Sequence, residues 1–166
     1  MSSDAIGATV SVTRTADTNA YAANDVIGAA TGSTAALTFA GMGAPGSRIM
    51  ITSTQLAIND TGVISGETSY RLHLYNVTPP SALGDNGAWD LPAGDRNAYL
   101  GFIDLGTVVD MGSTLYVEQN IYNKQIVLTP AEGANTQSLY AYLVTIGAYT
   151  PSASRVYKIT LHGVKL

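Results

Sequence analysis

The 166-residue sequence contains no cysteine, which excludes disulfides and thiolate metal sites and fits assembly in a reducing cytoplasm. Only 12% of its residues are charged, about half the usual share for a soluble domain. Lysine and glutamate are scarce, so few residues are available to cover an exposed helix. No apolar run approaches the roughly 18 residues of a membrane span. The first residues, MSSDAIGATV, lack the basic and apolar regions of a signal peptide.

The charge balance argues against a nucleic-acid partner. The formal net charge is −4 and no basic run occurs, whereas nucleic-acid-binding proteins neutralise phosphates with clustered Lys and Arg. We therefore expect no nucleic-acid partner and no membrane partner.

The chain is rich in residues that favour β-strands. Thr, Val, Ile and ten Tyr favour sheet, and short alternating runs recur between turn residues such as GMGAPG and NDTG. The pattern predicts a single all-β domain over residues 1–166, a sandwich or barrel of about eight to ten strands. An alanine-rich stretch at 16–26 is the alternative candidate for a helix, although its Asn and Asp compete for the backbone. The expected strands are 8–13, 24–29, 34–39, 47–58, 69–77, 98–105, 113–119, 124–129, 138–147 and 155–164.

Three of these strands predict where the core lies. Strand 138–147 is apolar on both faces, so it is either central or covered by another subunit. Together with the scarcity of charge, this predicts a homo-oligomer, most simply a trimer. In two other strands, alternate positions place large apolar residues on one face, and these expected core residues are Tyr70, Leu72, Leu74, Tyr157, Ile159 and Leu161.

The stretch VTPPSALGDNGAWDLPAGDRNAY, residues 77–99, is longer than an ordinary connection and holds the only tryptophan. Asp85, Asp90 and Asp95, with Asn86, could be calcium ligands. Their spacing does not match a calcium-binding loop and no bidentate Glu follows. We therefore favour turn-forming roles for these acids.

The sequence shows no catalytic or cofactor-binding set. Two of these carboxylates could flank a sugar beside Trp89, but nothing predicts a raised pKa for either. A nucleophile elbow and a phosphate-binding loop are both missing. His73 and His162 lie on different strands without metal-ligand spacing. We therefore expect a protein that is not an enzyme and needs no metal or cofactor.

Trp89 is the main candidate for a contact anchor, because tryptophan buries a large rigid area at low entropic cost. The alternative is that Trp89 folds back to cap one end of the sandwich. The prolines and glycines of 79–95 are not expected to form a ladder of backbone hydrogen bonds, so deleting the segment should cost the core little. The predicted protein-contact residues, in a loop near 78–97, are Leu83, Asp85, Trp89, Asp90, Leu91, Asp95 and Arg96.

Three segments carry a family resemblance. ADTNAYAANDVIG, YRLHLYNVTPPSALGDNGAWDLPAGDRNAYLGFIDLG and VYKITLHGVKL together resemble small head decoration (cement) proteins of tailed bacteriophages. The resemblance implies a β-sandwich or jelly roll, often trimeric, on the outside of the phage head. There it would clamp neighbouring subunits of the major capsid protein against the pressure of the packaged DNA. It also implies a location on the capsid surface of the virion after synthesis in the host cytoplasm.

The alternative function is a β-sandwich carbohydrate-binding or host-adhesion module, in a head fibre or a tail-associated protein. Trp89 with Tyr75 and Tyr99 would form its sugar platform, provided that the three rings are coplanar.

Overall fold

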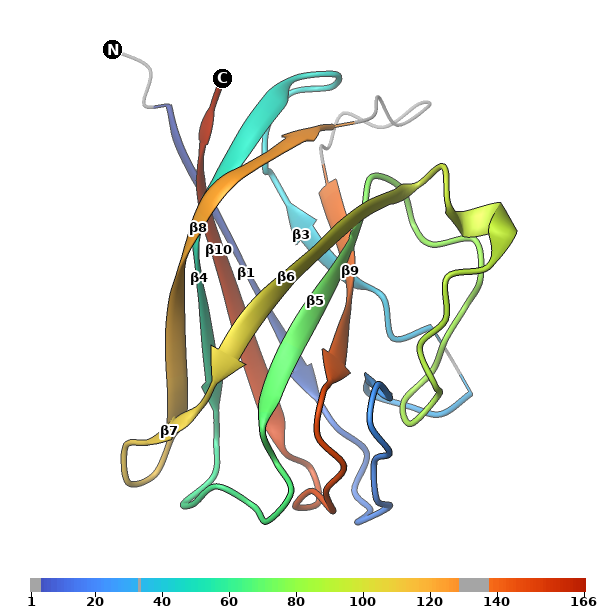
Figure 1. Ribbon diagram of the computed structural model, residues 1–166, viewed down its shortest axis with the longest axis vertical. Coiled ribbons are helices and arrows are strands. Elements are labelled where there is room, and N and C mark those ends of the chain that lie inside the picture. The colour runs from blue at the N-terminus through green and yellow to red at the C-terminus, as the bar shows by residue number, and fades with distance from the viewer. Residues whose placement is uncertain (1–3, 33, 129–137) are drawn as a thin grey trace.

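Ten strands in two antiparallel sheets form the fold (Figure 1), given by a computed structural model that describes residues 4–32, 34–128 and 138–166. Within these ranges the helical content is a single 3-10 turn, η1 (Ala93–Asp95). The strands are β1 (Ala5–Thr13), β2 (Val26–Ile27), β3 (Leu37–Ala40), β4 (Arg48–Ile58), β5 (Ser69–Tyr75), β6 (Tyr99–Thr107), β7 (Val109–Asp110), β8 (Leu115–Val127), β9 (Ser138–Thr145) and β10 (Val156–Lys165).

The order of the strands is that of a jelly roll. The first sheet runs β1-β10-β4-β8-β7, and the second runs β2-β9-β5-β6. Strand β3 also pairs with β9, so β2 and β3 are two parts of one interrupted strand. When β2 and β3 are counted as one strand, and β7 and β8 as one, the chain has eight strands. The first, eighth, third and sixth then form one sheet, and the second, seventh, fourth and fifth form the other. The prediction of an all-β sandwich is confirmed, and its topology is the two-sheet jelly roll.

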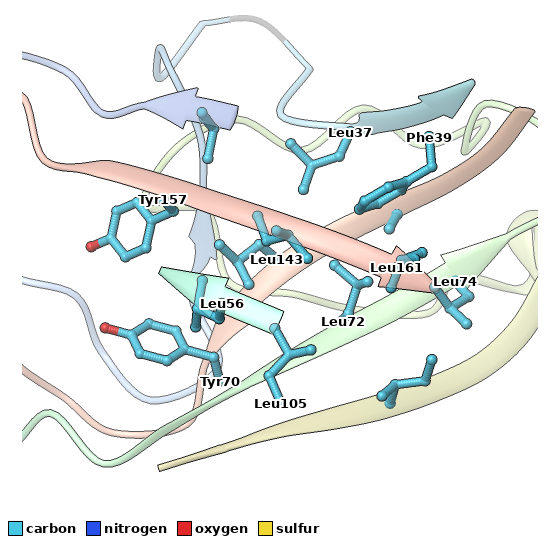
Figure 2. Close-up of a cluster of buried hydrophobic side chains, with 14 of the residues drawn as sticks. Leu37, Phe39, Leu56, Tyr70, Leu72, Leu74, Leu105, Leu143, Tyr157 and Leu161 are labelled. Carbon is cyan, nitrogen blue, oxygen red and sulfur yellow. The ribbon is translucent and has the colours of Figure 1, made fainter. Parts of the chain in front are cut away.

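The core lies between the two sheets, where the alternating residues of both sheets meet (Figure 2). Each apolar side chain of this kind contributes about 1.5–3 kcal/mol when it is removed from water. The six residues expected in the core are confirmed, since each has no measurable exposure: Tyr70, Leu72, Leu74, Tyr157, Ile159 and Leu161.

Strand β8 corrects one prediction. The stretches 113–119 and 124–129 were expected as two strands, but residues 115–127 form one long strand, and residue 129 lies outside the described residues. The turn-like asparagines of NIYN mark a β-bulge: pairing with β4 shifts between Ile51 and Ser53, and Asn123 takes a positive φ of 56°. A bulge accommodates extra residues without ending the strand.

The segment before β2 is not a helix. Residues 16–25 form bends, a turn and isolated bridges, with Tyr21 opposite Tyr149 and Asp25 opposite Ala88, and residue 26 begins β2. Of the expected strand 24–29, only Val26 and Ile27 pair as strand residues. The polar residues of this segment form contacts with the loop between β5 and β6, which are described below.

Candidate contact surface: the 76–98 loop and the two outer sheet faces

The loop of residues 76–98 connects β5 to β6 and lies on the side of the second sheet that faces away from the first (Figure 1). The expectation that this loop forms no backbone ladder is wrong. Its residues form hydrogen bonds with backbone groups of residues 24–30 and of residue 35. These hydrogen bonds are Ala35 N to Leu83 O (2.6 Å), Asp85 N to Ala30 O (2.9 Å), Asn86 N to Val26 O (2.9 Å), Val26 N to Gly87 O (2.8 Å) and Trp89 N to Asn24 O (2.9 Å).

Trp89 lies against the outer face of this sheet. Its indole stacks on the imidazole of His73 from β5, with ring centroids 3.6 Å apart and planes at 19°. Its Nε1 donates to the hydroxyl of Tyr75 at 3.2 Å. Tyr75 is itself fully buried, and burial raises the pKa of its hydroxyl to about 12. The ring of Trp89 therefore covers the sheet of its own chain.

His73 is held neutral at this position. Burial, followed by the positive charge of Arg71, lowers the pKa of His73 to about 4. Its Nδ1 is 2.9 Å from the hydroxyl of Tyr99 on β6. The imidazole therefore acts as an uncharged ring between Trp89 and the sheet at pH 7.

Leu83, Trp89 and Leu91 of the loop are half-buried and pack on a second apolar cluster. That cluster consists of Val26, Ala35, Tyr75, Ala98, Tyr142 and Val144. Tyr142 and Val144 come from β9, which explains why residues 138–147 are apolar on both faces. Two alternatives were left open for this strand, a central position or a cover from another subunit. The central position is the one observed, because the strand lies between β5 and the β2/β3 pair and its outer face is covered within the chain.

Asp85 fixes the tip of the loop to the N-terminal segment. It is buried, and its Oδ1 accepts hydrogen bonds from the Tyr21 hydroxyl at 2.5 Å and from Gly28 N at 2.9 Å. Its Oδ2 lies 3.8 Å from Nη2 of the buried Arg14, which also pairs with Asp17 at 2.8 Å. Burial and the hydrogen bond to Asp85 raise the pKa of Tyr21 well above its usual range. Asp85 therefore acts as an internal anchor.

The other predicted contact residues divide between buried and exposed positions. Asp95 is buried and accepts hydrogen bonds from the backbone N–H (3.2 Å) and the hydroxyl (3.0 Å) of Ser81. Asp90 is exposed and accepts a bond from Leu91 N at 2.8 Å, as expected for a turn-forming acid. Arg96 is exposed. Of the seven predicted contact residues, Asp90 and Arg96 are the two with exposed side chains.

A second buried ionic network closes the same end of the sandwich. Arg155 pairs with Glu67 at 3.0 Å and with Asp60 at 3.0 Å. The hydroxyls of Tyr149 and Tyr157 are 2.8 Å apart, and the hydroxyl of Tyr70 donates to Glu67. Burial raises the pKa of each of the three tyrosines in this network. Sequence analysis missed these residues, because isolated Arg and Glu at strand ends resemble ordinary surface positions.

The geometry also bears on the alternatives weighed from sequence. No group of three or more His, Asp or Glu side chains within residues 4–32, 34–128 and 138–166 is arranged to hold a metal ion. In the same ranges no helix is long and apolar enough to cross a membrane. Trp89, Tyr75 and Tyr99 do not form a flat platform. The rings of Trp89 and Tyr99 are inclined by 43°, those of Tyr75 and Tyr99 by 57°, and Tyr75 is fully buried.

The outer face of the first sheet is a surface that sequence analysis did not identify. Cross-strand register aligns its outward residues in three rows, with a Thr9–Thr160 hydroxyl contact of 2.9 Å in the middle row. Lys158 and Glu118 are the charged residues in these rows. Across β1, β10, β4 and β8 the rows read Gly7–His162–Ser53–Asn120, Thr9–Thr160–Gln55–Glu118 and Ser11–Lys158–Ala57–Tyr116.

Comparisons with known proteins give only weak likenesses. No protein-family model matches the chain, and no curated protein does. A chain from particles of Israeli acute paralysis virus is 12% identical, with 98% of this chain and 71% of that chain covered and a TM-score of 0.30. The vertex protein P5 of PRD1 is 11% identical, with 99% of each chain covered and a TM-score of 0.36.

A carbohydrate-active enzyme is also similar at this level. The CBM22-1–GH10 modules of Clostridium thermocellum xylanase 10B, in complex with xylohexaose, are 9% identical, with 100% of this chain and 29% of that chain covered and a TM-score of 0.35. These TM-scores are too low for any of the three likenesses to establish a shared fold or function.

Proposed function

We propose that this chain is a structural virion protein, a decoration protein that binds the major capsid protein on the outside of a tailed-phage head and stabilises the shell. Two observations support the proposal. The sequence resembles such proteins over three segments, and the topology is the jelly roll, a fold used by viral capsid domains and by lectins. A fold hosts many functions, so the function of this chain depends on the chemistry of its surface. We also propose that the role is binding and not catalysis.

The observation that carries the proposal is the bare outer face of the first sheet. Seven of the twelve residues in its three rows are Thr, Ser, Gln, Asn or Gly. The others are His162, Ala57, Tyr116 and the charged Lys158 and Glu118. Hydroxyl and amide groups can exchange water for a partner's hydrogen-bonding groups at low cost, whereas a buried unpaired charge is expensive. The buried centres of protein interfaces are correspondingly depleted of charged residues. This face is therefore suited to lie flat against another protein.

This assignment moves the contact away from the 76–98 loop. Five of the seven residues predicted there are buried or half-buried within the chain. The two predicted residues that are exposed, Asp90 and Arg96, are both charged.

The test is a complementation experiment with heads that lack the protein. A phage deleted for the gene should form DNA-filled heads that release DNA at a lower temperature, and added wild-type protein should restore the release temperature. Ser53→Arg places a charge on an inner strand of the bare face and should abolish binding to these heads. Asn97→Arg places the same charge on the exposed loop and should bind normally.

Each outcome of that experiment is informative. Failure of the wild-type protein to bind or protect such heads would refute the decoration role. If Asn97→Arg loses binding and Ser53→Arg keeps it, the loop is the contact surface and the assignment to the first sheet is wrong.

The homotrimer remains a prediction that sedimentation of the purified chain will check. One of its two supports has changed, because the outer face of β9 is covered by the chain's own loop. The remaining support is the low charge of the surface, and a trimer that persists at tens of micromolar is the expected result.

A further inference from the structure

A groove opens between β6 and β8, at the edge where the two sheets part. Strand β6 is last in the second sheet, and β7 pairs with β8 only near its start, at Leu115 and Tyr116. The groove has a volume of about 360 Å³, and Phe102 of β6 and Tyr122 of β8 both line it. It contains no residue of the loop and adjoins the bare sheet face at Asn120, which belongs to both.

Both aromatic rings are unusually exposed. Tyr122 is 85% exposed, and Phe102 is 45% exposed. The β8 bulge projects Tyr122 outward, and the neighbouring Asn123 holds a positive φ of 56°. Asparagine tolerates this left-handed conformation better than other non-glycine residues, and bulges commonly re-aim a side chain next to a functional site. The bulge therefore accounts for the exposed position of the Tyr122 ring.

Polar side chains from β8 reach across the groove to β6. Gln119 lies so close to Gly106 that a Cβ at that position would collide with its amide. Lys124 covers Gly101 in the same way, and its Nζ donates to Leu100 O at 2.6 Å. The two glycines thus allow an amide and an ammonium group to cross between the sheets.

The charges around the groove are already paired. Asp104 binds Arg71 at 2.7 Å, and the Arg71 guanidinium also lies 4.1 Å from the centre of the Phe102 ring. Burial lowers the pKa of Lys124, whose ammonium is directed at a carbonyl. What the groove offers a ligand is two aromatic rings and the amides of Gln119 and Asn120.

We propose that this groove binds a neutral, linear carbohydrate chain. Aromatic faces pack against the C–H faces of sugar rings, and side-chain amides pair with sugar hydroxyls, which is the usual division of labour in a small-molecule site. An acidic glycan would meet no free cation here. A peptide adding to the edge as a strand would meet β6 interrupted by the positive φ of Gly101 (89°) and Gly106 (84°), whereas strand addition requires a regular edge.

The experiment is an NMR titration of the isotope-labelled whole chain. The probes are cellohexaose, xylohexaose, maltohexaose and the N-acetylglucosamine hexamer, with hexagalacturonate as the acidic counterpart. At least one neutral probe should shift the amide signals of residues 102–104 and 119–124, and hexagalacturonate should not.

Tyr122→Ala should weaken that binding at least about tenfold, which corresponds to about 1.4 kcal/mol. Because Tyr122 is so exposed, this variant should keep its melting temperature. Tyr116→Ala is the matched control: it removes the same side chain from the same strand outside the groove and should bind as wild type. Phe102→Ala provides an independent test from the opposite wall and should also weaken binding.

Three outcomes would overturn the proposal. The first is that no neutral probe shifts any signal at about 10 mM, which would mean a dissociation constant well above that concentration. The others are undiminished binding by folded Tyr122→Ala, and shifts confined to residues outside the groove. Binding to phage heads is measured separately, so loss of sugar binding and loss of shell binding can be told apart.

Discussion

The outer faces of the two sheets differ in composition and in whether the chain covers them. The outer face of the second sheet carries Tyr75, Tyr142, Val144 and His73, and the chain covers it with the 76–98 loop. The outer face of the first sheet carries Thr, Ser, Gln and Asn beside a few other residues, of which Ala57 and Tyr116 are apolar or aromatic, and no described segment covers it. An antiparallel sheet can leave one face in water only if that face is polar. The difference shows that the loop covers an apolar face, and it is the basis for our proposal that the contact surface lies on the other sheet.

The largest effect should come from breaking the anchor of the loop. Asp85→Ala removes a buried carboxylate from the fully buried Arg14 side chain and from the Tyr21 hydroxyl. Arg14 keeps its pair with Asp17, but the buried Tyr21 hydroxyl and the Gly28 N–H both lose their acceptor. The free energy of unfolding should therefore fall by about 4 kcal/mol. Asp90→Ala, an exposed acid in the same loop, should change it by less than about 0.5 kcal/mol. Urea denaturation of both variants measures the difference, and equal effects would show that the loop is not held through Asp85.

Removing the Trp89 side chain, which covers the outer face of β5, should cause the next largest loss of stability. Trp89→Ala removes the ring stacked on His73 and exposes the outer face of β5, and we expect a loss of about 3 kcal/mol. Tyr122→Ala removes an exposed aromatic ring on the opposite edge and should leave stability nearly unchanged. Thermal melting of the two variants compares them. A Trp89→Ala protein that melts like wild type but fails to bind phage heads would return the contact surface to the loop.

The covered face should also give the protein a pH dependence. The pKa of His73 is about 4 in the folded state, against about 6.5 in the unfolded chain. As the pH falls below about 6.5 the unfolded state takes up a proton first, so stability is full above that value and is lost progressively toward pH 4. The loss should reach about 2 kcal/mol by pH 5.

Chemical denaturation at pH 7, 6 and 5 measures this dependence. His73→Phe keeps a ring under Trp89 but cannot titrate, so its stability should fall much less over this range. An unchanged slope in His73→Phe would assign the pH dependence to another group.

The smallest effect on stability is expected on the bare face. Ser53→Arg adds a side chain that can extend into solvent, so the free energy of unfolding should change by less than about 0.5 kcal/mol. The same variant is expected to lose binding to phage heads. A large loss of stability would show that Ser53 is part of the packed structure, and the binding result would then say nothing about a contact face.

Much of the fold followed from local pattern. Period-2 alternation located most of the strands and identified the core residues Tyr70 and Tyr157, because strand geometry alone puts alternate side chains on one face. The division of residues 113–129 into two strands was wrong, since Asn120 and Asn123 signal a turn but here form a bulge. Whether an asparagine with positive φ ends a strand depends on the strand beside it, which local sequence does not contain.

The candidate site was predicted less well for a related reason. Composition correctly singled out Trp89 and its neighbours as unusual, but it could not show which surface they touch. The partner of Trp89 is His73, on the preceding strand. The partners of Asp85 are Tyr21, Gly28 and Arg14, and each of these three lies 57 or more residues from Asp85 along the chain.

The sequence by itself determined an all-β protein with apolar strands, little surface charge and one aromatic loop, because these properties follow from composition and short-range periodicity. Only the tertiary structure decided that the loop covers the second sheet, that the first sheet stays bare, and that Phe102 and Tyr122 share a groove. Each of these depends on which strands become neighbours. In a jelly roll most neighbouring strands are distant in sequence, so their contacts are fixed by the packing of the whole core.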